Sequence, residues 1–314
     1  MTWVDELRAR EAVFRRSPSA HNTQPWTLDY RPDQVLVGVD PARALPASDP
    51  TRRDLALGLG AFVETCLIVA ADAGLAVTCD LSDPLRIRLV EAAARYRTPF
   101  TAADVDGRRV ARGPYAPGVV DPAIRAALEP GVAHVPSRDL ARDLLAADRW
   151  TYSTRKVVLE LRAWLRLDPR DPRYHRDGLT DRALGLSRVE ARLLSAALRA
   201  HPVTRHLGLA ALLAGSGRNL LRYDGSVLVL TSRGEDPRQA GRRLMRTWLT
   251  LARHDLAVHP LSQLVDCPAT AAGLAARVGA TPLAVFRVGR PRSEPVRSAR
   301  LPPQASASGS SRVL

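Results

Sequence analysis

Apolar positions recur at two spacings along the chain, which predict short strands separated by longer helices. Apolar residues at helical spacing, with charged residues opposite, predict a helix over 4–14. Two short β-rich runs follow at 27–30 and 34–39, joined by a Pro-Asp turn. The first part of the chain therefore opens with a helix and a strand pair.

A long apolar helix and a second strand pair complete this first pattern. The helix is predicted to start at the Asp-Pro pair at 49–50, to run through Ala71 and to end at Gly74. Strands are predicted around 75–79 and 86–90. The succession of strand pairs and one long helix indicates an α+β protein.

The second half of the chain repeats this order imperfectly. A helix-rich stretch at 190–221 leads to a strand at 226–231, and an Asp-Pro pair opens a helix over 236–252. A Leu-Ala-Val run at 256–258 repeats the same three residues of the first half, and 281–290 alternates like a central strand. The spacing differs between the halves, so the repeat is weak by itself.

The basic composition suggests nucleic acid, but the distribution of the charge favours another ligand. The chain has 46 Lys and Arg against 32 Asp and Glu, a net charge of +14, yet only 5% aromatic residues. Nucleic-acid modules gather Lys and Arg with aromatics on one face. Here almost every basic residue is Arg, and all are spread among acids, so we expect a small anionic ligand and no nucleic acid.

Hydropathy and cysteine usage predict a cytoplasmic protein without a membrane span. The most apolar stretch, 55–77, is interrupted by Glu64 and Asp72, and the first twenty residues are charged rather than typical of a secretory signal. Three cysteines stand far apart without metal-binding spacing, which predicts buried thiols and no metal site. They are Cys66, Cys79 and Cys267.

The segment 17–26, SPSAHNTQPW, carries the most specific chemistry in the chain. Its two prolines lack backbone N–H groups and fix φ, and Pro25 is expected to hold Gln24 extended. Short hydroxyl and amide side chains between them can bind backbone or an incoming ligand. A stiff polar loop that ends in Trp26 suits a flat polar cofactor. The alternative is an ordinary helix-to-strand connection with Trp26 in the core.

This loop resembles the flavin-contacting loop of the nitroreductase superfamily, which has the pattern Pro-Ser-x-x-Asn-x-Gln-Pro-Trp. The form with His-Asn-Thr is most similar to the Acg family of FMN-binding oxidoreductases. The resemblance implies that FMN is contacted by Pro18, Ser19, Ala20, Asn22 and Gln24. His21 could reach the ligand cleft, although a packed or solvent-facing histidine fits the sequence better.

Three further segments resemble ligand-contacting elements of the same family. Arg109 and Arg112 match an Arg-x-x-Arg element at the phosphate and ring edge, with an exposed linker as the alternative. Arg297 and Arg300 match a phosphate-binding pair after the last strand, with a solvated tail as the alternative. The third segment lies against one flavin face in the family, and it contributes Pro260, Leu261, Ser262 and Gln263.

The resemblance also implies a domain organisation. Typical nitroreductases are homodimers, and this chain is similar to such a dimer fused into one polypeptide. The expected fold is a nitroreductase-like α+β fold with mainly antiparallel sheets flanked by helices, in two related halves. These are 1–95 and 96–300, with a lid-like insertion or a solvated linker at 167–187 and a disordered tail at 301–314. The loop occurs once, so one flavin site is expected, in a monomer that acts as a fused dimer or associates further.

The function implied is an FMN-dependent oxidoreductase. NAD(P)H would reduce the flavin, which would then reduce a small-molecule substrate such as a nitroaromatic or a quinone. The chain contains no nucleophile elbow, Walker loop or dinucleotide-binding glycine motif that would favour another chemistry. A lidded site also allows the alternative of a non-catalytic protein that binds or sequesters FMN.

Overall fold

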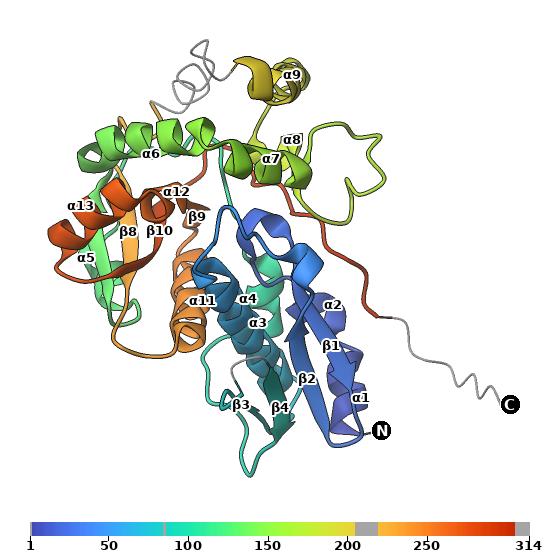
Figure 1. Ribbon diagram of the computed structural model, residues 1–314. Helices are drawn as coiled ribbons and strands as arrows, with labels where there is room; N and C mark the ends of the chain where they lie inside the picture. Colours follow the sequence, from blue (N-terminus) through green and yellow to red (C-terminus); the bar gives the residue numbers. More distant parts are fainter. Residues whose placement is uncertain (1, 84–85, 205–218, 305–314) are drawn as a thin grey trace, which may run out of the picture.

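Two four-stranded antiparallel sheets flank a central pair of helices (Figure 1). The computed structural model describes residues 2–83, 86–204 and 219–304. The strand orders are β1-β2-β4-β3 and β5-β8-β10-β9. The strands are β1 (Trp26–Tyr30), β2 (Gln34–Val39), β3 (Val77–Asp80) and β4 (Ile87–Glu91) in the first sheet, and β5 (Val132–Pro136), β8 (Ser226–Thr231), β9 (Ala257–Pro260) and β10 (Pro282–Gly289) in the second.

Both sheets are built by the same succession of elements. In each, two antiparallel neighbours are followed by a long helix, an edge strand and a strand that returns to the middle. The long helices are α3 (Arg53–Asp72) and α11 (Pro237–Arg253). The sheets differ between their first two strands, because a short turn joins β1 to β2 whereas residues 137–225 separate β5 from β8.

The remaining helices cover the ends and edges of this framework. Figure 1 shows α6 and α7 across one end of the two long helices, with α9 beyond them. The helices are α1 (Trp3–Arg8), α2 (Glu11–Phe14), α4 (Ala102–Gly107), α5 (Pro122–Ala126), α6 (Ala141–Ser153), α7 (Arg155–Trp164), α8 (Asp181–Leu184), α9 (Arg188–Thr204), α12 (Gln263–Asp266) and α13 (Pro268–Val278). A two-stranded parallel ladder joins β6 (Leu165–Arg166) to β7 (Leu179–Thr180).

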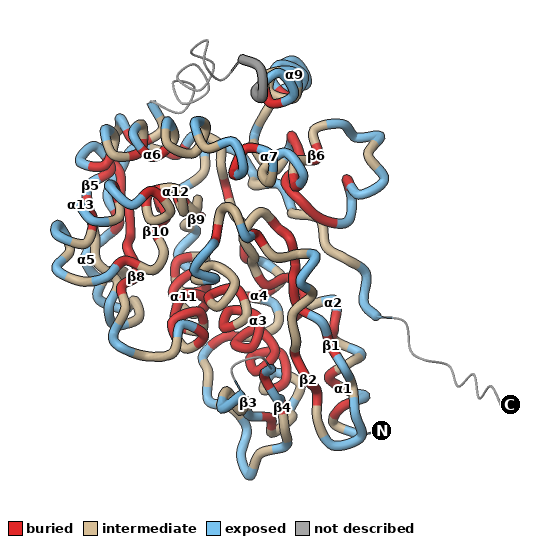
Figure 2. The backbone as a smooth tube through the Cα atoms, viewed as in Figure 1, coloured by how far each residue is buried: buried red, intermediate tan, exposed pale blue. Residues whose placement is uncertain are grey.

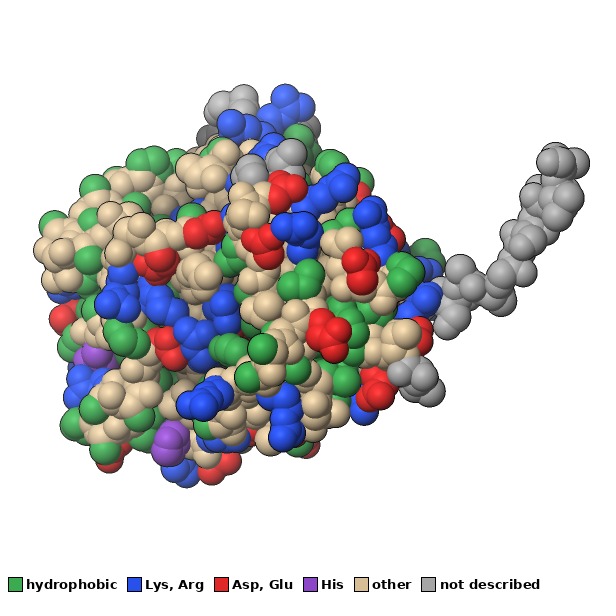
Figure 3. Space-filling view, turned by 90° about the horizontal axis from the view of Figure 1, so that it is seen from below, with side chains coloured by type: hydrophobic (Ala, Val, Ile, Leu, Met, Phe, Trp, Pro, Cys, Tyr) green, Lys and Arg blue, Asp and Glu red, His purple; other side chains and the backbone are tan. Residues whose placement is uncertain are grey.

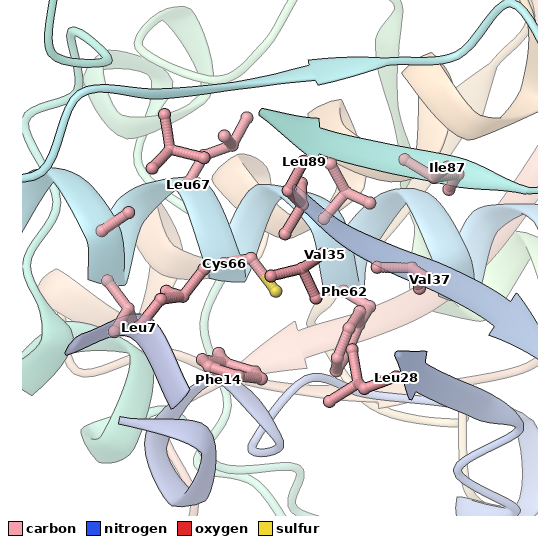
Figure 4. Packing of buried hydrophobic residues seen from close by; sticks show 14 of the residues in the cluster. Leu7, Phe14, Leu28, Val35, Val37, Phe62, Cys66, Leu67, Ile87 and Leu89 are labelled. Carbon is pink, nitrogen blue, oxygen red and sulfur yellow. The ribbon is translucent and has the colours of Figure 1, made fainter. Parts of the chain in front are cut away.

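The first core forms where α3 packs between the first sheet and the N-terminal helices (Figure 4). Phe62 of α3 stacks on Trp26 at 4.5 Å between ring centroids and meets Phe14 edge-on at 5.8 Å. Burying side chains of this size contributes roughly 1.5–3 kcal/mol each. Trp26 therefore belongs to the core, as the alternative interpretation of the loop predicted, and it fixes the loop's last residue.

Helix α3 is buried nearly all round, as the red tube in Figure 2 shows. Among the described residues, α3 is the one helix that is long enough and apolar enough to cross a bilayer. Its most apolar stretch has a mean hydropathy of 1.8, and 72% of that stretch is buried inside the protein. Its apolar surface is thus used by the core. The cytoplasmic location stays a prediction.

Glycines allow α3 and α11 to approach closely. A Cβ on Gly60 would overlap the carbonyl oxygen of Arg238, and a Cβ on Gly241 would overlap that of Leu57. Arg238 lies three residues before Gly241 in α11, and Leu57 lies three residues before Gly60 in α3. The contact is therefore reciprocal. Such a contact has the form expected of a two-fold axis between the helices.

Charge on the outer surface is mixed. On the face seen in Figure 3, Arg and Lys side chains are interspersed with Asp and Glu. Several arginines of the described chain form ion pairs between neighbouring elements, such as Arg253 with Asp104 and Arg246 with Glu129. On this face, the excess of arginine does not form one continuous basic stripe.

Several elements differ from the sequence predictions. The helix predicted over 4–14 is two helices, because the chain leaves helical geometry at Arg10. Strand β5 and helix α6 fall where no element was predicted. The helix-rich stretch at 190–221 begins as α9, but 205–218 lies outside the described residues, as does most of the predicted disordered tail, 305–314.

The three cysteines are free thiols, as the sequence predicted. Cys66 and Cys267 are buried, and Cys79 is partly buried. Burial raises the pKa of both Cys66 and Cys79, which keeps these thiols protonated and unreactive at neutral pH.

The glycine contact predicts a selective loss of stability. Gly60→Ala and Gly241→Ala should each lower the free energy of unfolding by about 3 kcal/mol, because the new methyl forces the helices apart. Gly273→Ala on α13 is the matched control, since open space surrounds that glycine. It should be neutral or stabilising by up to about 1 kcal/mol. Urea unfolding of the three variants checks this, and equal midpoints would contradict it.

Candidate cofactor site

A cavity of about 510 Å³ is lined by segments that lie far apart in the chain. Its walls come from the loop at 17–26, from α3 and α11, from the segment 108–112, from β9 and β10, and from α6 to α8 above. The volume falls within the range of about 300–1,000 Å³ that small-molecule sites occupy. The cavity is therefore large enough for a cofactor-sized ligand.

The 17–26 loop holds an unusual backbone conformation at this cavity. His21, Asn22 and Gln24 have φ values of 46°, 55° and 52°, in the left-handed region that side chains other than glycine avoid. The prediction that Pro25 keeps Gln24 extended is therefore wrong. The Ser19 hydroxyl accepts a hydrogen bond from the Gln24 amide at 2.9 Å, which stabilises the turn. Strain of this kind clusters at ligand sites, where the surrounding structure must enforce it.

Side-chain hydrogen bonds of Asn22 fix that conformation. Its Nδ2 donates to the carbonyls of Gly178 at 3.0 Å and Ala299 at 3.1 Å, and its Oδ1 accepts from Arg300 at 2.8 Å. Both ends of the amide are thus used within the protein. Asn22 lines the cavity as a positioning residue of the loop.

Gln24 ties the loop to two distant segments and lies outside the cavity lining. Its Nε2 donates to Arg176 O at 2.9 Å, and its Oε1 accepts from the Leu301 amide at 2.8 Å. Pro18, Ser19 and Ala20 do line the cavity. The loop therefore presents its first half to the cavity and anchors its second half.

Arg300 uses all five of its guanidinium donors within the protein. They reach the carbonyls of Arg15, Arg16, Ser17 and Ala299 and the side chain of Asn22. Burial lowers its pKa well below that of a free guanidinium. Arg300 lines the cavity but chiefly fastens the start of the loop.

Arg108 has free donor capacity at the cavity. Its side chain is 6% exposed, its Nη2 donates to Arg16 O at 3.0 Å, and its Nε and Nη1 are buried without a partner. The guanidinium lies over the Trp248 ring at 5.5 Å, and the indole N–H of Trp248 is also unpartnered. Burial and the nearby Arg16 and Arg109 lower the pKa of Arg108 to about 9.

Buried cations gather around Arg108 without neutralising acids. Within the described residues, no carboxylate lies within ion-pairing distance of Arg16, Arg108, Arg112 or Arg300. Burying unpaired charge costs several kcal/mol per ion. An arrangement with surplus buried N–H donors beside a cavity is complementary to an anion such as a phosphate.

The other predicted arginines take different positions. Arg109 and Arg112 both line the cavity, and Nη1 of Arg112 donates to Ala183 O of α8 at 3.2 Å. Arg297 is about half exposed and forms an ion pair with Asp106, away from the cavity lining. The structure thus brings Arg109, Arg112 and Arg300 together and leaves Arg297 at the surface.

The segment after β9 is split between the cavity and the core. Pro260, Ser262 and Gln263 line the cavity. Leu261 is fully buried in the hydrophobic core between the second sheet and helices α6, α12 and α13. Its amide donates to Val285 O at 2.7 Å. This backbone bond places the residues on either side at the cavity.

Carboxylates occupy another part of the wall. Asp148 of α6 accepts a hydrogen bond from Gln263 Nε2 at 3.1 Å, and burial raises its pKa to about 6. Burial, with Asp54 nearby, raises the pKa of Asp266 to about 7. Nη2 of Arg53 lies 2.7 Å from both Asp54 and Asp266. The cavity therefore has charges of both signs on its walls.

The segment at 167–187 is packed against the loop rather than solvated throughout. Asp177 is 1% exposed and forms ion pairs with Arg43, Arg166 and Arg173, at 3.1 Å for Arg43 and 3.0 Å for Arg166. The amide of the next residue, Gly178, donates to Asn22 O at 3.2 Å. Some of the charged residues that suggested a solvated linker at 167–187 therefore belong to a buried cluster of ion pairs around Asp177.

Sequence patterns did not single out several residues of the site. Arg16 precedes the 17–26 loop, and Arg108 precedes Arg109, which the sequence did select as a site residue. Local sequence does not say which of two such neighbours is buried, because the fold decides it. His21, for which the sequence favoured a packed or solvent-facing position, lines the cavity with its Nδ1 buried and unpartnered. Asp49 was predicted only as part of a helix start, and Trp248 carries no motif, but the fold brings both to the cavity.

Comparisons with known proteins agree with the class of protein suggested by the loop. No established family profile matches the chain. Acg of Mycobacterium tuberculosis, provisionally named as an NAD(P)H nitroreductase, is 28% identical over 95 residues, 29% of each chain. Rv3131 of the same organism, with the same provisional activity, is 31% identical over 71 residues, 23% of this chain and 21% of that protein. The matches span less than a third of these relatives.

One solved structure is also similar in outline. It is the FMN-dependent nitroreductase NfnB of Mycobacterium smegmatis in complex with NADPH, at 19% identity and a TM-score of 0.35, covering 68% of this chain and 96% of that chain. The sequence matches support a distant relationship to the nitroreductase superfamily.

The buried Asp148 predicts a pH-dependent effect on stability. An unfolded Asp ionises near pH 4, whereas Asp148 in the folded protein ionises near pH 6, so its ionisation costs stability as the pH rises through this window. Asp148→Asn should therefore stabilise the protein by about 1–2 kcal/mol at about pH 8 and have little effect at about pH 4. Denaturant unfolding at both values tests this. A benefit independent of pH would contradict it.

Proposed function

We propose that the protein binds FMN in this cavity and uses it as an NAD(P)H-dependent oxidoreductase. The observation that carries the proposal is the group of buried and partly buried arginines without carboxylate partners, of which Arg108 lines a cavity of cofactor size and has two donors without a partner. The phosphate of FMN supplies the missing charge and acceptors. The short matches to provisionally named NAD(P)H nitroreductases point to the same electron donor.

The residues around the cavity fit the separate parts of such a cofactor. Arg108 and Arg109, with Ser298, would hold the phosphate. Pro18, Ser19 and Ala20 of the loop would contact the ribityl chain and ring from one half of the fold. Pro260, Ser262 and Gln263 would contact the ring from the other half. The described wall between them is apolar, which suits the flat face of an isoalloxazine.

The protein's own part in the reaction is positioning. A bound flavin supplies the redox chemistry by accepting hydride and passing electrons to a second substrate. The strained loop, fixed by Arg300 and Asn22, holds the ring contacts in place before binding. Arg112, with its pKa lowered by burial to about 10, remains protonated and can stabilise negative charge at the ring edge.

We further propose that the chain is a fused dimer with one retained flavin site. Two features support this: both sheets have the same strand order around a long helix, and the Gly60 and Gly241 contacts are reciprocal. The proposed halves are 1–95 and 96–300. Residues 167–187 would act as a lid, within a longer insertion between β5 and β8.

A second candidate is a protein that stores FMN without turning it over. The bonds between Gly178 and Asn22 and the ion pairs of Asp177 favour it, because they fasten the covering segment over the loop. Opening the cavity to a second substrate would cost these contacts. The two candidates differ in whether NAD(P)H reaches the flavin.

Spectroscopy of the purified protein separates the candidates. We expect a yellow protein with the absorption of FMN, since the arginine group retains the phosphate. Anaerobic NADH or NADPH should bleach it, and a nitroaromatic should restore the colour. A flavin that binds but stays oxidised would support storage, and a protein that binds no flavin would overturn both.

Substitution of Arg108 tests the phosphate site. Arg108→Met should weaken FMN binding about 10- to 100-fold, because a charge-assisted hydrogen bond to phosphate contributes about 1.5–3 kcal/mol. The flavin-free variant should be as stable as the parent or more so, since a buried unpaired charge is removed. Arg95→Met, at an exposed position, is the charge-matched control. Equal FMN affinity in both variants, measured by titration calorimetry, would refute the assignment.

A further inference from the structure

The proposed phosphate and ring contacts leave one wall of the cavity unused. This wall carries four carboxylates from three different helices or their ends: Asp49, Asp54, Asp148 and Asp266. In the described structure none of them forms an ion pair with the arginines that would hold phosphate. They therefore form a separate acidic wall, the name used below for these four residues.

One cation partly neutralises the acidic wall. Arg53 bridges Asp54 and Asp266, with 2.7 Å from its Nη2 to an oxygen of each. Asp148 receives a neutral hydrogen bond from Gln263. Among the described residues, Arg53 is the arginine that ion-pairs with this wall, so four carboxylates face one guanidinium.

Asp49 supplies an independent sign of a missing partner. It is 7% exposed and lines the cavity. Its Oδ2 accepts the Leu55 amide at 2.8 Å, but its Oδ1 is buried without a donor, and so is the hydroxyl of the adjacent Ser48. A buried carboxylate oxygen without a donor costs roughly 1–3 kcal/mol or more, unless a ligand satisfies it.

We propose that the acidic wall binds a positively charged nitrogen on the acceptor substrate, with Asp49 and Asp148 as specificity-determining residues. The proposal rests on the proposed flavin chemistry and adds the class of acceptor: a small aromatic compound that carries an ammonium group. Trp150 and Tyr152 of α6 also line the cavity, and aromatic faces beside a carboxylate suit a quaternary ammonium.

An organic cation fits this wall better than a metal ion. In the part of the chain that the structure describes, no three His, Cys, Asp or Glu side chains are placed to hold a metal. Asp54, Asp148 and Asp266 belong to α3, α6 and α12, and Asp49 lies in the turn before α3. An organic cation can lie beside these carboxylates while its aromatic part lies along apolar side chains.

Binding of an unreactive probe tests the proposal without turnover. Benzyltrimethylammonium chloride should bind the parent protein in titration calorimetry, with and without FMN. Asp49→Asn and Asp148→Asn should each weaken binding about tenfold, since each removes one charged partner. Asp33→Asn, in the exposed β1–β2 turn, is the charge-matched control and should bind like the parent. Thermal unfolding verifies that each variant is folded.

Three acceptors of similar shape then test specificity in the FMN-loaded protein. They are para-nitrobenzyltrimethylammonium, para-nitrobenzyl alcohol and para-nitrobenzoate. The cation should have the lowest KM, and Asp148→Asn should raise that KM about tenfold while leaving the KM of the alcohol unchanged. Equal KM values for cation and alcohol, or probe binding that is unchanged in both Asp variants, would overturn the proposal.

The outcomes also separate this inference from the proposed function. If FMN is bound and reduced but the cation has no advantage, the acidic wall has no role in specificity and the proposed function stands. If the probe binds and both substitutions weaken it, but no flavin binds, the wall is a cation site and the proposed flavin function fails.

Discussion

Direct backbone contact between α3 and α11 is the constraint on which the rest of the structure depends. Gly60 and Gly241 let the helices meet without intervening side chains, so each helix is buried by its partner as well as by its own sheet. This contact fixes the distance between the two sheets. The same two helices form part of the cavity wall, through Leu57 and Ala61 of α3 and Leu244 and Trp248 of α11.

Buried polar groups without a partner mark the proposed binding surfaces more clearly than the shape of the cavity does. Elsewhere the arginines pair with acids or carbonyls, as Arg242 does with the buried Glu64. Around the cavity, Arg108 on one wall and Asp49 on another keep unsatisfied polar atoms at low exposure. Opposite charges on separate walls fit the proposed arrangement, in which cofactor and substrate each neutralise one wall.

The sequence predicted the regular elements better than it predicted the cavity. The sequence placed strands β2 and β8 at their observed bounds, and the Asp-Pro pair at 236–237 marked the start of α11. The pair at 49–50 lies in a turn, and α3 begins only at Arg53. Buried positions of Arg16, Arg108 and Asp49 depend on contacts between residues far apart in the chain, which local patterns do not contain. The left-handed backbone of Gln24 is the clearest case, because the tertiary bonds to Arg176 and Leu301 override the local preference before proline.

The contact between Arg300 and the loop has a consequence for how the protein is made. The guanidinium reaches the carbonyl of Arg15 across 285 positions of the chain, so the loop can take its strained form only after nearly all of both sheets has been synthesised. Domains fold as units while synthesis proceeds. The cavity beside this loop is therefore the last part of this molecule to mature, and the proposed flavin site of a nascent chain is incomplete until its two sheets already stand together.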